Sequence, residues 1–130
     1  MLKQINTTEN QNDKLTEIII GCCFQKHNEL GHGFLEKIYA NALKIKLNQA
    51  GLLFQAEKEF DVIFQDVNIG KFRCDLFVEN QVIVELKSVT GFQPKLFQSQ
   101  LLSYLKASKV KTGLLINFGN TSCEIKRLSV

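Results

Sequence analysis

Apolar residues in the first third of the chain recur with the period of a helix. From Asp13, a suitable N-cap, an apolar stripe runs to about residue 29. The segment Leu30–Gly33 holds two glycines that favour a turn, and a second stripe follows over Phe34–Ala50. Gly51 is then the expected C′ residue. The pattern predicts two successive amphipathic helices.

After Gly51 the period changes to two, which is typical of strands. Strands are expected over residues 53–64, 69–78, 82–89, 112–118 and 122–128. The first of them is expected to break near Glu57-Lys58, and Asp66–Asn68 is expected to form a turn. Pro94 suits the first turn of a third helix over Lys95–Ser108. This order predicts an α/β fold in which helices flank both faces of a mixed β-sheet.

The composition fits one soluble globular domain. The chain has 130 residues, of which 45% are hydrophobic and 22% charged. We expect a single domain over residues 13–130 and a disordered or frayed N-terminus over residues 1–12, which are mostly polar. The net charge of +3 permits a nucleic-acid partner without arguing for one.

The four cysteines and the N-terminus bear on location. No C-x-x-C pair is present, so the cysteines are interpreted as reduced, mostly buried thiols of a cytoplasmic protein. The N-terminus lacks the apolar run of a signal peptide. No apolar stretch approaches the roughly 18 residues that span a bilayer. We therefore expect no membrane partner.

Two acids and a lysine stand in the most apolar part of the chain. Asp75 lies in the stretch Phe72–Val78, and Glu85 and Lys87 lie in Val82–Val89. Ionised groups are expensive to remove from water unless they are paired or bound to a metal. Glu85 and Lys87 are two residues apart, so they share one face of their strand.

The loop between the two strands decides whether the acids meet. If Glu79–Gln81 forms a three-residue hairpin loop, Val78 pairs with Val82, and Asp75 pairs with Glu85 on the same face. A two-residue loop would shift the register by one and separate the acids. We predict the three-residue loop.

Two carboxylates directly opposite each other repel, and a cation between them removes that cost. Oxygen ligands suit a hard ion, Mg²⁺ or Mn²⁺. Lys87 beside them could hold a water molecule or a scissile phosphate, so the set predicts metal-assisted hydrolysis of a phosphodiester. The alternative is an exposed strand face on which Glu85 and Lys87 form a solvated pair.

The spacing Asp75-x9-Glu85-x-Lys87 resembles the core signature of the PD-(D/E)XK nuclease superfamily, with Cys74 where a proline often stands. The resemblance implies a restriction-endonuclease-like αβββαβ core, here with an extra N-terminal helix. The string Gly33-x-x-Glu36-x-x-Tyr39 is similar to the GxxExxY protein family, a branch of that superfamily.

The resemblance implies further metal ligands. A glutamate from the first core helix often completes the superfamily's metal site, which assigns Glu36 as a third acidic ligand, directly or through water. The Leu86 carbonyl would be an extra ligand. The alternative for Glu36 is a favourable interaction with the helix dipole. Tyr39 would pack against the sheet or orient Glu36.

The string Gln100-x-x-x-Tyr104 resembles a motif that follows the E-x-K strand in the recombination-exonuclease branch, where both residues lie near the active site. The alternative is an amphipathic helix that uses Tyr104 for packing. Four lysines could track a nucleic-acid backbone or be solvated: Lys95, Lys106, Lys109 and Lys111.

The expected function is therefore a Mg²⁺- or Mn²⁺-dependent nuclease that acts on nucleic acid, chiefly DNA. Asp75 and Glu85 would hold the metal, and Lys87 would position or deprotonate the attacking water. A homodimer would enlarge the small surface for a duplex. The alternative is a catalytically inactive nuclease-fold module that binds nucleic acid or protein. A nucleotide-binding enzyme is disfavoured, because no glycine-rich P-loop string is present.

Overall fold

The computed structural model describes residues 7–91 and 93–130, with side chains described from residue 13 onward. Its helices are α1 (Thr7–Leu30), α2 (Glu36–Gln49) and α3 (Lys95–Ser108). Its strands are β1 (Phe54–Ala56), β2 (Glu59–Phe64), β3 (Val67–Arg73), β4 (Leu76–Val78), β5 (Val82–Lys87), β6 (Thr112–Asn117) and β7 (Glu124–Ser129).

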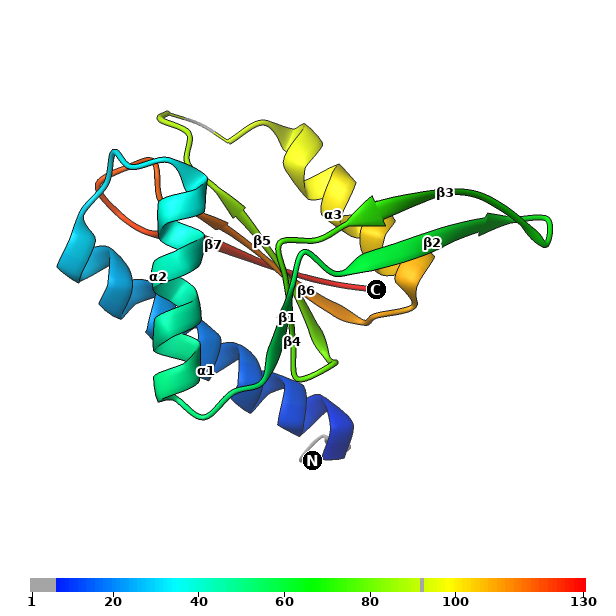
Figure 1. Ribbon diagram of the computed structural model, residues 1–130, viewed down its shortest axis with the longest axis horizontal. Coiled ribbons are helices and arrows are strands. Elements are labelled where there is room, and N and C mark those ends of the chain that lie inside the picture. Colours follow the sequence, from blue (N-terminus) through cyan, green and yellow to red (C-terminus); the bar gives the residue numbers. More distant parts are fainter. Residues whose placement is uncertain (1–6, 92) are drawn as a thin grey trace, which may run out of the picture.

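Five strands form one mixed sheet in the order β1-β4-β5-β6-β7. The central strands β5 and β6 are parallel and are joined through α3, whereas the other neighbours are antiparallel. Strands β2 and β3 pair only with each other and project from the body as a two-stranded ribbon (Figure 1).

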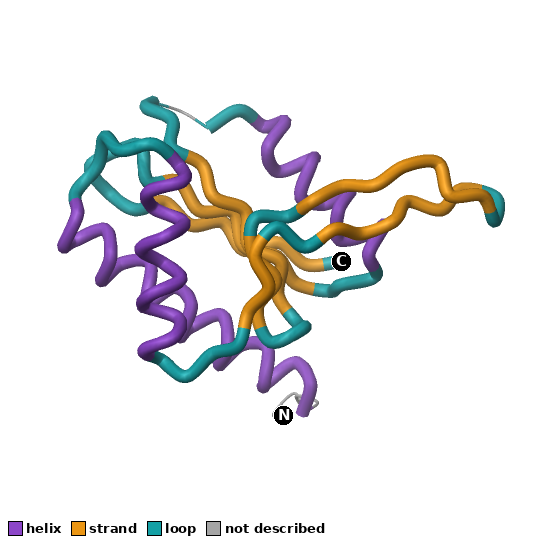
Figure 2. Tube along the Cα trace, in the orientation of Figure 1, coloured by secondary structure: helices purple, strands orange, loops and turns teal. Residues whose placement is uncertain are grey.

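Helices cover both faces of the sheet (Figure 2). On one face, α1 and α2 pack against alternate residues of β5: Val82, Val84 and Leu86. On the other face, Leu101 and Leu105 of α3 pack against Ile83 and its neighbours. Because β5 is apolar on both sides, it lies buried between two cores. The predicted α/β fold is confirmed.

The ribbon begins where two expected strands are interrupted. The break expected at Glu57-Lys58 is confirmed, and it separates β1 from β2. The single strand expected over residues 69–78 is wrong, because a bend at Cys74-Asp75 separates β3 from β4. The turn expected at Asp66–Asn68 is present but lies at Gln65-Asp66, since β3 already begins at Val67.

The bend also changes the face on which Cys74 lies. In an uninterrupted strand Cys74 would share a face with Leu76, but Cys74 packs with Phe77 on the α3 side. A continuous strand alternates its side chains, and the bend interrupts that alternation.

The first helix begins earlier than expected. α1 starts at Thr7, so Asp13 is not its N-cap but an internal residue that forms an ion pair with Arg127 at 2.5 Å. Residues 1–6 of the expected frayed segment lie outside the described residues. At the end of α2, Gly51 has a φ of 78°, which confirms it as the C′ glycine.

All four cysteines are free and buried, as expected. None of the helices in the described part of the chain combines the length and the apolar character that crossing a membrane requires.

Candidate active site

Asp75 lies at the point where the ribbon leaves the sheet. Its carbonyl accepts a hydrogen bond from the N–H of Glu57 at 2.9 Å, and the N–H of Cys74 donates to the Lys58 carbonyl at 3.0 Å. These two bonds join the bend at Cys74-Asp75 to Glu57-Lys58, the segment between β1 and β2. That segment therefore holds the bend that carries Asp75 in place.

The predicted hairpin register is confirmed. Val78 pairs with Val82, and Leu76 pairs with Val84, so the next pair along the strands is Asp75 and Glu85. The N–H of Asp75 donates to Oε1 of Glu85 at 3.2 Å, and the N–H of Leu86 donates to Oδ2 of Asp75 at 2.7 Å. The structure thus brings the two acids together.

The environment of the pair disfavours negative charge. The Glu85 residue is only 6% exposed. Burial first, and then the Asp75 carboxylate, raise the pKa of Glu85 to about 8. Burial and the same two acids raise the pKa of the neighbouring Cys74 thiol to about 12. The positive charge near the acid pair is therefore too small to offset the effects of burial and of Asp75 on the pKa of Glu85.

Lys87 ends β5 beside the acids. Its Nζ lies 4.6 Å from the centre of the Phe97 ring on α3. Its charge favours the ionised forms of both Glu85 and Glu36, and so acts to lower their pKa values. The ammonium group is thus within electrostatic reach of two carboxyl groups.

Glu36 begins α2 and shares a pocket of about 400 Å³ with Asp75 and Leu86. Burial is the main cause that raises the pKa of Glu36, with Asp75 contributing in the same direction. Within the described residues, no group of three or more His, Cys, Asp or Glu side chains is arranged to hold a metal ion. Glu36 therefore faces the pocket without completing a preformed ligand set.

The tyrosine of the G-x-x-E-x-x-Y string fixes the start of α2. The Tyr39 hydroxyl donates to the Gly31 carbonyl at 2.8 Å and accepts from the N–H of Phe34 at 3.1 Å. The Ser88 hydroxyl, directly after Lys87, donates to the Phe34 carbonyl at 2.7 Å. These bonds connect the turn before Glu36 to the end of β5. Sequence reasoning missed Ser88, because a single serine carries no pattern.

Tyr104 lies near Asp75 and Glu85, whereas no hydrogen bond in the described residues joins the Gln100 side chain to either acid. The Tyr104 ring stacks on Phe72 with centroids 4.1 Å apart. Burial first, then Glu85 and Asp75, raise the pKa of Tyr104. Gln100 is exposed one turn earlier on α3, and within the described residues its side chain forms no hydrogen bond to either acid.

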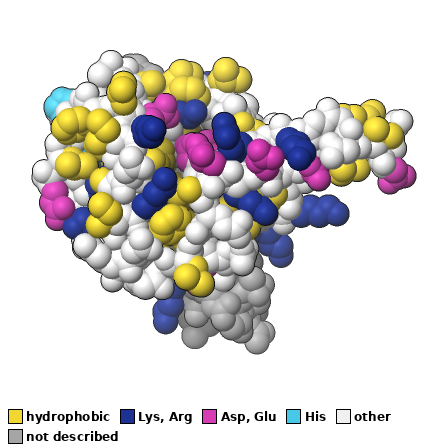
Figure 3. Space-filling view, in the orientation of Figure 1, with side chains coloured by type: hydrophobic (Ala, Val, Ile, Leu, Met, Phe, Trp, Pro, Cys, Tyr) yellow, Lys and Arg dark blue, Asp and Glu magenta, His cyan; other side chains and the backbone are white. Residues whose placement is uncertain are grey.

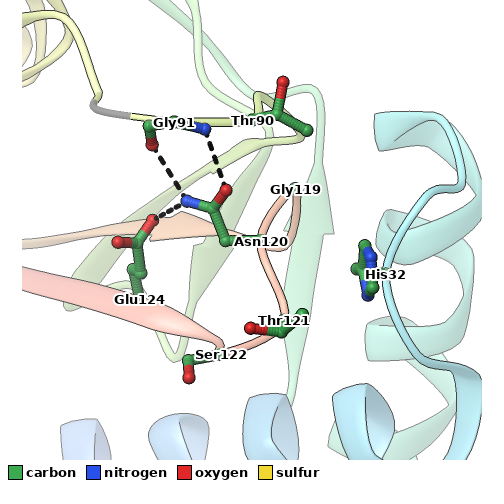
Figure 4. Close-up of a pocket in the computed structure, with 8 residues that line it drawn as sticks. All are labelled: His32, Thr90, Gly91, Gly119, Asn120, Thr121, Ser122 and Glu124. Carbon is green, nitrogen blue, oxygen red and sulfur yellow. Dashed lines mark hydrogen bonds between the residues drawn. The ribbon is translucent and has the colours of Figure 1, made fainter.

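A second pocket, of about 510 Å³, lies beyond the carboxyl ends of β5 and β6, next to His32 (Figure 4). The Asn120 side chain bridges both backbone groups of Gly91 at 2.9 Å and donates to Glu124 at 2.8 Å. The buried Asn117 likewise bonds both backbone groups of Val89 at 2.9 Å. These asparagines brace the loops after the two parallel strands, a role that the sequence pattern did not reveal.

Comparison with known proteins bears on this arrangement. The model of the PD-(D/E)XK nuclease superfamily matches residues 13–128. The chain belongs to this superfamily. No curated protein matches the chain.

A solved structure shares the fold of this superfamily member. The structure titled "Crystal structure of SSO0001" superimposes with a TM-score of 0.58 at 17% sequence identity, covering 99% of this chain and 69% of that one. At this identity the likeness concerns the fold alone.

Proposed function

We propose that this protein is a metal-dependent nuclease that hydrolyses phosphodiester bonds of nucleic acid, with DNA as the expected substrate, and that it belongs to the GxxExxY branch. The observation that carries the proposal is the paired placement of Asp75 and Glu85 beside Lys87. Membership of the PD-(D/E)XK superfamily supports the same chemistry, because its members generally use divalent metal ions.

The chemistry of the acid pair fits a hard divalent cation, Mg²⁺ or Mn²⁺. Two carboxyl groups meet in a buried position, and burial and the Asp75 carboxylate raise the pKa of Glu85, so a positive charge there would be favourable. Asp75 and Glu85 would hold the ion, the Leu86 carbonyl would add a ligand, and Glu36 would reach it directly or through water. When bound, the ion would activate water and neutralise the charge that develops on the phosphate.

The chain's own groups have separate roles in this proposal. Lys87 would orient the attacking water or accept its proton, and its ammonium form would stabilise the pentavalent phosphate. Its Nζ lies over the Phe97 ring, and this contact limits the positions of the amine. Tyr104, stacked on Phe72, would brace the site, and Gln100 would contact the substrate from the exposed face of α3.

Cleavage of labelled single- and double-stranded DNA and RNA, with Mg²⁺, Mn²⁺ or EDTA, tests the proposal. We expect wild-type protein to cut only with a divalent ion, and Glu85→Gln and Lys87→Met to lose the activity. Glu59→Gln and Lys71→Met remove the same groups from an exposed ion pair on the ribbon and should leave the activity intact. Equal residual cleavage in all variants would contradict the proposal. Binding without cleavage would instead favour the inactive module.

A further inference from the structure

The pocket beside the acid pair is also lined by helix α2, which carries two lysines there. One stripe of α2 lines it, through residues 36, 37, 40, 41 and 44. The neighbouring stripe of α2, about a quarter turn away around the helix, holds Tyr39, Leu43 and Leu47, which are fully buried. Because the core fixes that stripe against the sheet, the helix must present Lys37 and Lys44 toward the pocket.

We infer that this pocket binds the sugar-phosphate backbone of a nucleic-acid strand, with Lys37 and Lys44 as its phosphate contacts. The inference rests on the proposed function in taking nucleic acid as the ligand. It adds the side from which the strand approaches the acids, along α2. The contacts are to phosphates, so they would confer affinity without reading the base sequence.

The free charges on α2 support this role. In the part of the chain with described side chains, the ion pairs involve neither Lys37 nor Lys44. The Lys44 ammonium makes only a long contact of 3.5 Å with Asn41, its neighbour in the pocket. Figure 3 shows lysine or arginine and acidic side chains interspersed over α2 and the base of the ribbon. Both ammonium groups are thus available to an anion.

The spacing of the two lysines suits a strand. Lys44 follows Lys37 by seven positions of α-helix, a rise of about 10.5 Å, which is close to the axial rise of three nucleotides at about 3.4 Å of duplex axis per phosphate of one strand. Ala40 lies between them on the same stripe, and its small side chain leaves room for the strand to approach.

The pocket's charge makes this binding depend on a cation. Three carboxyl groups and two ammonium groups line it, from Glu36, Glu57, Asp75, Lys37 and Lys44. Without a cation the acids repel a phosphate. A divalent ion at the acid pair changes the net charge of the pocket from negative to positive. The nucleic-acid strand and the ion should therefore bind cooperatively.

The lysines considered from the sequence lie elsewhere. Lys111 directly precedes Thr112, which pairs with Val82 at the start of β5. Lys106 lies in the last turn of α3, near the same end of the sheet. Glu85 lies three residues further along β5, about 10 Å away at the rise of a strand. Lys106 and Lys111 therefore provide a matched pair of exposed lysines outside the pocket.

Fluorescence anisotropy with a labelled oligonucleotide, single-stranded or duplex, tests the inference. The double variant K37Q/K44Q is compared with K106Q/K111Q and wild type, with Ca²⁺ as the divalent ion or with EDTA, over about 0.05 to 0.2 M salt. We expect K37Q/K44Q to weaken binding about tenfold and to reduce the slope of log K against log salt by about 1.4 to 1.8. Circular dichroism confirms that each variant is folded.

The outcomes separate the inference from the proposed function. K106Q/K111Q should bind like wild type, and EDTA should weaken wild-type binding. Equal losses in both double variants, or no loss in K37Q/K44Q, would overturn the inference even if the protein cleaves nucleic acid. Absence of any wild-type binding would overturn it as well. Binding that depends on Lys37 and Lys44 without cleavage in Mg²⁺ or Mn²⁺ would instead leave it standing and reject the nuclease activity.

Discussion

The backbone N–H of Asp75 donates a hydrogen bond to the Glu85 carboxylate at 3.2 Å, so two acidic residues ten positions apart in the sequence are direct neighbours in the fold. This contact holds the carboxyl groups close although they repel each other. The result is a site whose stability depends on protons and cations.

Glu85→Gln should stabilise the metal-free protein at neutral and higher pH. The pKa of Glu85 is about 8 in the folded state against 4.5 as a free side chain, so the folded state binds the proton more tightly. The free energy of unfolding of the wild type should therefore fall as the pH rises from 4.5 to 8. Urea unfolding in EDTA should show the variant's advantage growing by roughly 4 kcal/mol across that range. A constant difference would contradict the assignment.

Glu36→Gln should weaken the effect of a divalent ion without abolishing it. A ligand at 100 times its dissociation constant stabilises a protein by about 2.7 kcal/mol. Glu36 shares the pocket with Asp75 but belongs to no preformed set of three ligands. Thermal melts in Mg²⁺ or Mn²⁺ should show the full shift for wild type, a reduced shift for Glu36→Gln and none for Asp75→Asn. An unchanged shift in Glu36→Gln would remove Glu36 from the metal site.

Lys87→Met should separate chemistry from metal binding. Methionine keeps most of the length of the side chain but removes the amine that lies over the Phe97 ring. We expect cleavage to slow by about 10² or more, which is the usual effect of losing an acid–base or charge-stabilising group. Metal-induced stabilisation should persist, because the variant removes the repulsion between the Lys87 ammonium group and the metal ion. Calorimetric titration with Mn²⁺ checks the second point, and loss of metal binding would count against the role proposed for Lys87.

Tyr39→Phe should loosen the turn that precedes Glu36. The ring can still stack on Phe118, 4.9 Å away, but the N–H of Phe34 and the carbonyl of Gly31 lose their partner. We expect a loss of about 1 to 3 kcal/mol in unfolding free energy. Hydrogen exchange should accelerate at the Phe34 amide more than at amides of β6, and a uniform acceleration would indicate a general packing role.

Lys26→Met should change how stability depends on pH. The Lys26 residue is 1% exposed, with its Nζ 2.8 Å from the centre of the Phe118 ring and 3.3 Å from the Tyr39 carbonyl. Burial is the main cause that lowers its pKa from 10.5 to about 7. Above pH 7 the unfolded state therefore binds more protons than the folded state, and stability rises with pH through this group.

The measurement for Lys26 is the difference in unfolding free energy between wild type and Lys26→Met. Glu85 also titrates in this range, but it is present in both proteins, so its contribution cancels to a first approximation. The variant's relative stability should fall by about 1.4 kcal/mol per pH unit from pH 7 to 8.5. A flat difference would show that Lys26 is solvated and charged in the folded protein.

Much of the site followed from local patterns. The three-residue loop Glu79–Gln81 and the alternation of side chains were sufficient to predict that Asp75 lies opposite Glu85. The helix over Lys95–Ser108 was predicted to the residue, because Pro94 marks its start and its apolar stripe is regular. These features depend on neighbours in sequence, and short-range chemistry determines them.

The sequence by itself determined the order of the elements, the register of the hairpin and the identity of the acid pair. Only the tertiary structure decided that the chain bends at Asp75 and leaves the sheet as a ribbon, because hydrogen bonds to the break at Glu57-Lys58 hold that bend. It also decided which lysines lie beside the acids. Their placement depends on how α2 rotates when Tyr39, Leu43 and Leu47 enter the core, and packing between distant segments leaves no period in the sequence.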